Sequence, residues 1–342
     1  MKPFLSLAFL CIVISQTITA QTTSIDRKQF FSDTSIVNAT ITTNMGKLFS
    51  KNKQGYTVSG VFSTTLPDGT AVNDPIQMEM RGHSRHDICY VPPIKLICNA
   101  NKSSVISSLK SLKLVSECKT SIQYEQYLLK EYIAYKIYNL LTDMSFHVRL
   151  LRVNFQDSLG KKKPIPVYSF LLEDIKDVAK RNDCAEWKGE KLATERTNRK
   201  QMTMVAMFEY MIGNTDWAVS VKHNIKLIHS EKDSLAKPFA VPYDFDYSGL
   251  VNTDYAIPDE RLDIENVRQR IYRGFPRTES EVSETLNIFF QQKEKIYATI
   301  NNFELLNSFS KKEMIDYLDQ FYEAVKKPKD AKWIFIDNAR TQ

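Results

Sequence analysis

The chain is organised around a segment that begins with Phe208-Glu209-Tyr210-Met211-Ile212-Gly213-Asn214-Thr215-Asp216-Trp217. It continues through His223-Asn224-Ile225-Lys226-Leu227-Ile228 and ends with Pro242-Tyr243-Asp244-Phe245-Asp246-Tyr247-Ser248-Gly249. Its pattern predicts a helix over residues 202–211 that stops at Gly213, since glycine is the usual helix C-terminus. Two short apolar strands are predicted at residues 225–228 and 239–241. The stretch therefore reads as helix, loop, hairpin and loop.

Such a hairpin can bring oxygen-bearing side chains from its two loops to one end. Asp216 lies in the first loop, Asn224 leads into the first strand, and Asp244 and Asp246 follow the second strand. Magnesium is bound in proteins through carboxylate and other oxygen ligands, usually together with substrate phosphates. The spacing therefore predicts a metal-dependent site at this end of the hairpin.

The same segment resembles the catalytic segment of atypical kinases: the CotH spore-coat family, the HipA toxins and, more distantly, the phosphoinositide kinases. The resemblance implies that Asp216 is the catalytic aspartate, that Asn224 and Asp244 bind Mg²⁺, and that Asp246 is a further or alternative ligand. One departure is that Asn224 lies eight residues after Asp216, whereas protein kinases place this asparagine about five residues after the aspartate. The intervening loop is therefore expected to bulge.

A second segment, Arg81-Gly82-His83-Ser84-Arg85, precedes Pro92-Pro93 and the predicted strand at residues 94–97. A glycine turn flanked by serine and arginine can offer amides and guanidinium groups to phosphate oxygens. The segment resembles the Arg-Gly-Asn-Ser turn of CotH-type kinases, which implies ATP binding by Arg81, Gly82, Ser84 and Arg85. The plainer alternative is a surface turn with solvated arginines.

Glu131 lies on a predicted helix, residues 124–141, among tyrosines at helical spacing. A carboxylate on a half-buried face needs a polar partner, because burying it unpaired is costly. The kinase resemblance makes Glu131 the partner of a nucleotide-binding lysine, either Lys95 or Lys113, and the sequence does not choose between them. The alternative is a carboxylate that accepts hydrogen bonds from tyrosine hydroxyls.

The N-terminus and the cysteines bear on location. Residues 1–20 read as a secretory signal peptide, with Lys2 before an apolar run too short to span a membrane. We therefore expect an exported protein, periplasmic or extracellular, with no stable membrane insertion after cleavage. Four cysteines remain in the mature chain (Cys89, Cys98, Cys118 and Cys184), which allow three pairings of two disulfides, although one structural disulfide or buried thiols is the plainer interpretation. Cys89 and Cys98 are close enough in sequence to close a loop.

Composition places few limits on the partner. The chain has 342 residues, a formal net charge of +6 and 43% hydrophobic residues. This is an ordinary globular composition, and without a long basic run it does not argue for nucleic acid. A basic segment, residues 267–274, is predicted as a solvated helix face or, by resemblance, as a substrate-facing segment. Two late helices are expected to begin with capping boxes at Thr278 and Ser310.

Taken together, the sequence predicts an α+β protein with the two-lobed fold of atypical protein kinases. A β-rich N-terminal lobe would span residues 21–172 and a mainly helical C-terminal lobe residues 173–342. By resemblance, the protein would use ATP and Mg²⁺ to phosphorylate a hydroxyl of an unidentified protein substrate. Transfer of AMP instead of phosphate remains open. The alternative from a different class is a catalytically inactive protein of the same fold that serves binding or surface assembly.

Overall fold

Seven strands in the N-terminal half form a closed barrel. The computed structural model describes residues 25–50, 57–81, 89–98 and 105–341. Around the barrel the strands follow the order β1 (Val37–Thr43), β2 (Thr57–Thr65), β3 (Ala71–Met80), β4 (Ile94–Ile97), β5 (Ser111–Ser116), β7 (Ile165–Leu172) and β6 (Val148–Asp157). Neighbours are antiparallel except β1 and β6, which run parallel and close the barrel, from Val37 opposite Leu151 to Thr43 opposite Asp157.

The closed barrel corrects the predicted fold class. The expected two-lobed kinase fold has a β-sheet N-terminal lobe, whereas here the first strand pairs with β6 and leaves a mixed barrel beside helices. The physical reason lies in long-range pairing. Local alternation identified most of the strands, but the β1–β6 pairing joins segments more than a hundred residues apart and has no local signal.

Side chains alternate along a strand, and both faces are buried over the first four residues of β6 and the last six of β7. Leu151, Val153 and Val167 point into the barrel, where they join a core of apolar side chains. Leu150 and Phe170 point outward into a second core that they share with the helices. The barrel and the helical part are therefore joined through a common apolar layer.

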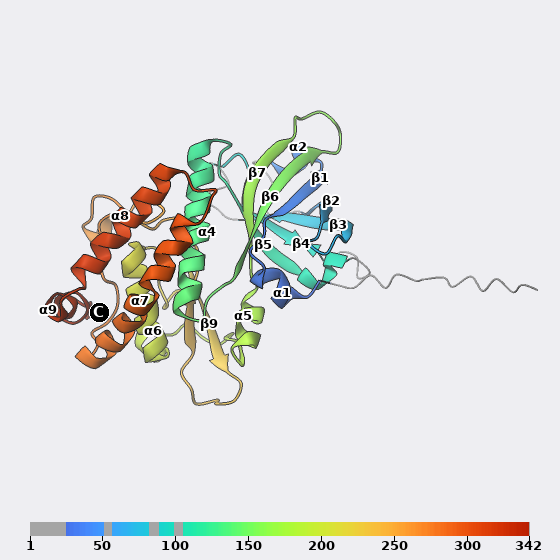
Figure 1. Cartoon of the computed structure of the whole chain (residues 1–342). Helices are drawn as coiled ribbons and strands as arrows, with labels where there is room; N and C mark the ends of the chain where they lie inside the picture. The colour runs from blue at the N-terminus through green and yellow to red at the C-terminus, as the bar shows by residue number, and fades with distance from the viewer. Residues whose placement is uncertain (1–24, 51–56, 82–88, 99–104, 342) are drawn as a thin grey trace, which may run out of the picture.

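The helix α4 (Ile122–Leu141) lies in that layer, between the barrel and the later helices (Figure 1). Its side chains are buried for most of its length.

The remaining elements, in chain order, are α1 (Arg27–Ser32), α2 (Met45–Leu48), η2 (Val105–Leu109), α5 (Ile175–Arg181), β8 (Cys184–Glu186), η3 (Thr194–Arg196), α6 (Arg199–Ile212), β9 (Ile225–Ser230), β10 (Phe239–Pro242), η4 (Glu260–Leu262), α7 (Glu279–Asn301), α8 (Ser308–Ala324), α9 (Pro328–Lys332) and η5 (Trp333–Asp337). Strands β10, β9 and β8 form a separate sheet. Leu172, the predicted domain boundary, is the last residue of β7.

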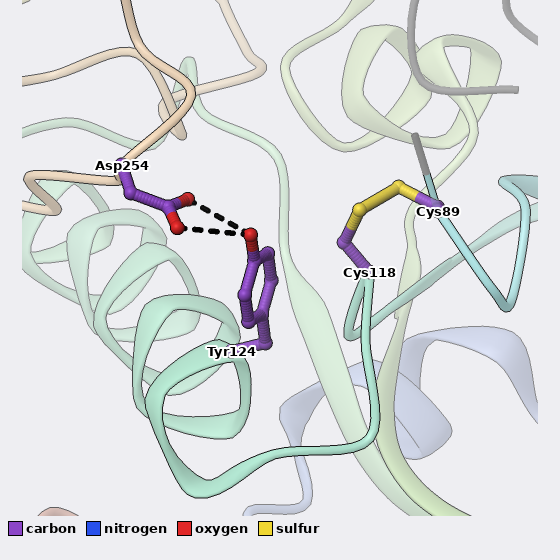
Figure 2. The surroundings of a disulfide bond; sticks show 4 residues. All are labelled: Cys89, Cys118, Tyr124 and Asp254. Carbon is purple, nitrogen blue, oxygen red and sulfur yellow. Dashed lines mark hydrogen bonds between the residues drawn. A yellow bond between two sulfur atoms is a disulfide. The ribbon is translucent and has the colours of Figure 1, made fainter. Parts of the chain in front are cut away.

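One disulfide joins Cys89, just before β4, to Cys118, between β5 and α4 (Figure 2). The suggested pairing of Cys89 with Cys98 is therefore wrong, because Cys98 is a buried free thiol at the end of β4, as is Cys184 in β8. Near the disulfide, the Tyr124 hydroxyl donates to both carboxylate oxygens of Asp254, each at 3.0 Å. These contacts fix the start of α4 against the C-terminal half.

Candidate functional site

Three carboxylates meet where α4 approaches the loop after β10. One oxygen from each of Glu131, Asp244 and Asp246 lies within 4.8 Å of the others, close enough to hold one metal ion. Glu131 and Asp246 are buried, and Asp244 is half-buried. The backbone N–H of Asp244 donates to the Tyr135 hydroxyl of α4 at 2.8 Å, which ties the loop to the helix. Asp244 and Asp246, predicted as metal residues, thus lie together with Glu131, which had been expected to pair with a lysine.

Two of these predicted site residues have left-handed backbone conformations. Asn224 has φ +50° and Asp244 has φ +69°. Asparagine and aspartate tolerate this region better than other residues with a Cβ, although it still carries strain. The N–H of Tyr243 donates to the Asn224 carbonyl at 3.0 Å, so the two strained residues lie at the same end of the hairpin. Backbone strain of this kind is concentrated at functional sites.

Asp216 is held in one orientation by its own loop. Its N–H donates to Asn214 Oδ1 at 3.0 Å, and its Oδ1 lies 2.6 Å from His223 Nε2. The Asn224 amide donates to Asp216 Oδ2 at 3.0 Å and to the Asp216 carbonyl at 2.8 Å. The carboxylate of Asp216 is therefore fixed but still partly exposed.

The long spacing between Asp216 and Asn224 is taken up by a turn. Ala218 and His223 form an isolated antiparallel bridge, and the Lys222 N–H donates to the Val219 carbonyl at 3.0 Å between them. The expected bulge is confirmed. Sequence reasoning missed His223, although its place directly before Asn224 was a usable signal.

Positive charge gathers beside the carboxylates. Lys113 of β5 lies on the outer face of the barrel, with its Nζ 4.1 Å from the centre of the Tyr243 ring, and Lys226 of β9 lies 6.0 Å from the same centre. Burial and, next, the charge of Arg81 lower the pKa of Lys113 to about 8, while Asp244 opposes the shift. Arg81 directly follows β3, where its N–H donates to the Pro93 carbonyl at 2.9 Å.

The two candidate lysines have different partners. Lys95 lies opposite Lys113 in the β4–β5 pairing, but its Nζ lies 3.4 Å from Glu79, and both side chains are partly exposed. Lys113 instead lies over the ring of Tyr243, next to Asp244, whose charge acts to raise the pKa of the lysine. Gly82, Ser84 and Arg85, together with the predicted signal peptide, lie outside the described residues, so Arg81 is the described member of the predicted phosphate-binding turn.

The basic segment at residues 267–274 is neither a helix nor a solvated face. Arg270 donates to the Met211 and Tyr317 carbonyls, and Arg273 donates to the Thr215 and Trp217 carbonyls. The prediction of a solvated helix is therefore wrong, since these arginines satisfy the carbonyls of neighbouring segments.

The comparisons with known proteins do not add a family. No protein-family model matches the chain, and no curated protein matches it significantly. Within the described part of the chain, every helix is too short or too polar to cross a membrane.

Proposed function

We propose that this chain is a magnesium-dependent phosphotransferase that uses ATP. The observation that carries the proposal is that an acidic group of side chains lies near a basic one, with Lys113 Nζ 4.1 Å from the ring of Tyr243, the residue before Asp244. Glu131, Asp244 and Asp246 can bind one cation through oxygen, and Lys113 and Arg81 lie around Asp244 and Tyr243. A metal ion with a polyphosphate needs both kinds of group next to each other.

The residues divide among three tasks: binding the metal ion, binding the phosphates and orienting the acceptor. Asp244, Asp246 and Glu131 would hold Mg²⁺, which neutralises charge on the phosphates, and Lys113 would bind phosphate oxygens. The amide nitrogen of Asn224 donates to Asp216, so its amide oxygen is the side-chain atom that would bind a cation. Asp216, held by His223 and Asn224, would orient the accepting hydroxyl and receive its proton.

The acceptor and the location belong to the same proposal. We assign the acceptor as a hydroxyl of a protein, as the sequence resemblance implies, and the location as outside the cytoplasm. The Cys89–Cys118 disulfide supports export, because disulfides persist mainly in oxidising compartments.

The proposal is tested with ATP that carries a radioactive label on either the γ- or the α-phosphate. The purified mature chain is incubated with Mg²⁺ or with a chelator, alone and with unfolded proteins as hydroxyl donors. Asp216→Asn is the test variant, and Asp233→Asn, on an exposed turn, is the matched control. Incorporation of γ-label that needs both Mg²⁺ and Asp216 is the expected result.

Other outcomes decide among the alternatives. Incorporation of α-label identifies AMP transfer. Magnesium-dependent ATP binding without any incorporation identifies an inactive binding protein. The absence of both binding and incorporation contradicts the proposal.

A further inference from the structure

Arg273 lies against the loop that carries Asp216. Its Nη1 donates to the Thr215 carbonyl and, at 3.0 Å, to the Trp217 carbonyl. These two carbonyls flank Asp216 on either side. We propose that Arg273 is a positioning residue that fixes the main chain of Asp216 and so aims its carboxylate, an inference that rests on the phosphotransferase function proposed above.

The Asp216 loop is held by contacts to the side chain of Asp216 and by contacts to its main chain. His223 and Asn224 contact the carboxylate, and Asn224 also contacts the carbonyl of Asp216 itself. Arg273 holds the main-chain carbonyls of the residues before and after Asp216. Thr215 and Trp217 are buried, so without the guanidinium both carbonyls would lose a donor where water cannot easily replace it. The loop would then be free to relax.

Burying the charged guanidinium of Arg273 costs free energy, which argues that this side chain has a role. Burial, chiefly, and the charge of Arg340 lower the pKa of Arg273, while Asp259, Asp216 and Glu209 act in the opposite direction. The guanidinium carbon also lies 5.6 Å from the centre of the Trp217 ring, so its plane packs beside the loop. The planar guanidinium, with several donors in fixed directions, can donate to both the Thr215 and the Trp217 carbonyl at once.

Arg270, three residues earlier, is a matched control. Its Nε and Nη2 each donate to the Met211 carbonyl at 3.2 Å, and Nη2 also donates to the Tyr317 carbonyl at 2.5 Å. Its guanidinium carbon lies 3.6 Å from the centre of the Tyr317 ring, and burial lowers its pKa too. Arg270 therefore satisfies main-chain carbonyls at the end of α6 and in α8 in the same way as Arg273 does in the Asp216 loop. It does not contact the residues on either side of Asp216.

The experiment compares Arg273→Met, Arg273→Lys and Arg270→Met in the full mature chain. The measurements are the turnover number for phosphate transfer, Mg-ATP affinity and amide hydrogen exchange over residues 214–224. For Arg273→Met we expect turnover to fall at least about tenfold, because small displacements of a reacting group are costly, with unchanged Mg-ATP affinity. Exchange over residues 214–224 should accelerate. Arg273→Lys, which keeps a charged donor, should recover part of both losses.

Arg270→Met should lower the melting temperature while leaving exchange over residues 214–224 and turnover of the folded enzyme unchanged. The inference is overturned if Arg273→Met keeps both normal turnover and normal exchange, or if Arg270→Met reproduces its effects. If the wild-type chain transfers nothing, the proposed function fails, and hydrogen exchange alone still decides whether Arg273 holds the loop.

Discussion

The side-chain amide of Asn224 donates to both the carboxylate and the carbonyl of Asp216, at 3.0 and 2.8 Å. Two residues of the same predicted hairpin segment, eight positions apart, thus form one hydrogen-bonded unit. The left-handed backbone of Asn224 makes this contact possible, because it turns the chain from the Asp216 loop into β9. The Tyr243 N–H donates to the Asn224 carbonyl, and Tyr243 directly precedes Asp244. The unit therefore lies beside the carboxylate cluster.

Asp216→Asn tests the role of the charge in this unit. Asparagine keeps the shape of the side chain but cannot accept a proton from a hydroxyl. Turnover should fall by about 10²–10⁴-fold, the usual contribution of a general base. Mg-ATP affinity should stay unchanged, since Asp216 is assigned to the acceptor. Joint loss of binding and thermal stability in this variant would instead indicate that Asp216 is a structural residue of the loop.

Lys113→Met removes a charge while keeping the length of the side chain. A hydrogen bond to a charged group contributes about 1.5–3 kcal/mol, so ATP affinity should fall about tenfold or more. Lys95→Met, on the neighbouring strand and paired with Glu79, is the control and should bind normally. Equal losses in the two variants would argue against a specific phosphate contact by Lys113.

The same lysine predicts a pH dependence of binding. Because the pKa of Lys113 in the free protein is about 8, its ammonium group is present below this pH and is lost as pH rises through it. ATP affinity of the wild type should therefore decline between pH 7 and pH 9, and Lys113→Met should flatten that decline. Titration calorimetry at several pH values measures both curves, and parallel curves would contradict the assignment.

Glu117 predicts a pH dependence of stability that is separate from the site. Its Oε1 accepts from the Tyr168 N–H at 2.9 Å, and burial raises its pKa from 4.5 to about 7. The folded state thus binds the proton more tightly, so the stabilisation is complete below pH 4.5 and is lost as pH rises through about 7. Glu117→Gln keeps the acceptor without the charge and should raise the melting temperature at pH 8 but not at pH 5. Glu190→Gln, at an exposed position, should leave the melting temperature unchanged at both pH values. An identical shift in the two variants would show that the effect does not come from the raised pKa of Glu117.

Gly213→Ala tests the turn that starts the Asp216 loop. Gly213 has φ +67°, and an added Cβ would collide with the Tyr317 hydroxyl. The left-handed backbone alone should cost about 1–2 kcal/mol, and the collision adds to this. Adding Tyr317→Phe, which removes the hydroxyl, should restore part of the lost free energy of unfolding in denaturant titrations. Full stability of Gly213→Ala would show that the loop can rearrange freely.

Local features of this chain were readable from its sequence. The helix stop at Gly213, the strand pair at residues 225–228 and 239–241, and the capping box at Thr278 all match the structure. Each depends on residues within a few positions of one another. The second late helix was placed less well, since α8 begins at Ser308 with Asn307 as its cap rather than at Ser310.

Features that depend on contacts between distant parts of the chain could not be predicted from the sequence. The β1–β6 pairing closes the barrel, and Cys89 joins Cys118 rather than Cys98. Glu131 meets two carboxylates of the C-terminal half because α4 packs between the barrel and the later helices, and its own helix gives no sign of this. His223 approaches Asp216 only once the turn between them has formed.

Calorimetric titration of the mature chain with ATP, with and without Mg²⁺, for the wild type and Asp244→Asn tests directly whether the three carboxylates form a metal–phosphate site. Asparagine tolerates the left-handed backbone at this position, so the variant should stay folded while losing a metal ligand. The account predicts ATP binding by the wild type that requires Mg²⁺, and loss of that binding in Asp244→Asn at an unchanged melting temperature. Binding that is equally tight without Mg²⁺, or unaltered in the folded variant, would contradict a metal–phosphate site formed by Glu131, Asp244 and Asp246.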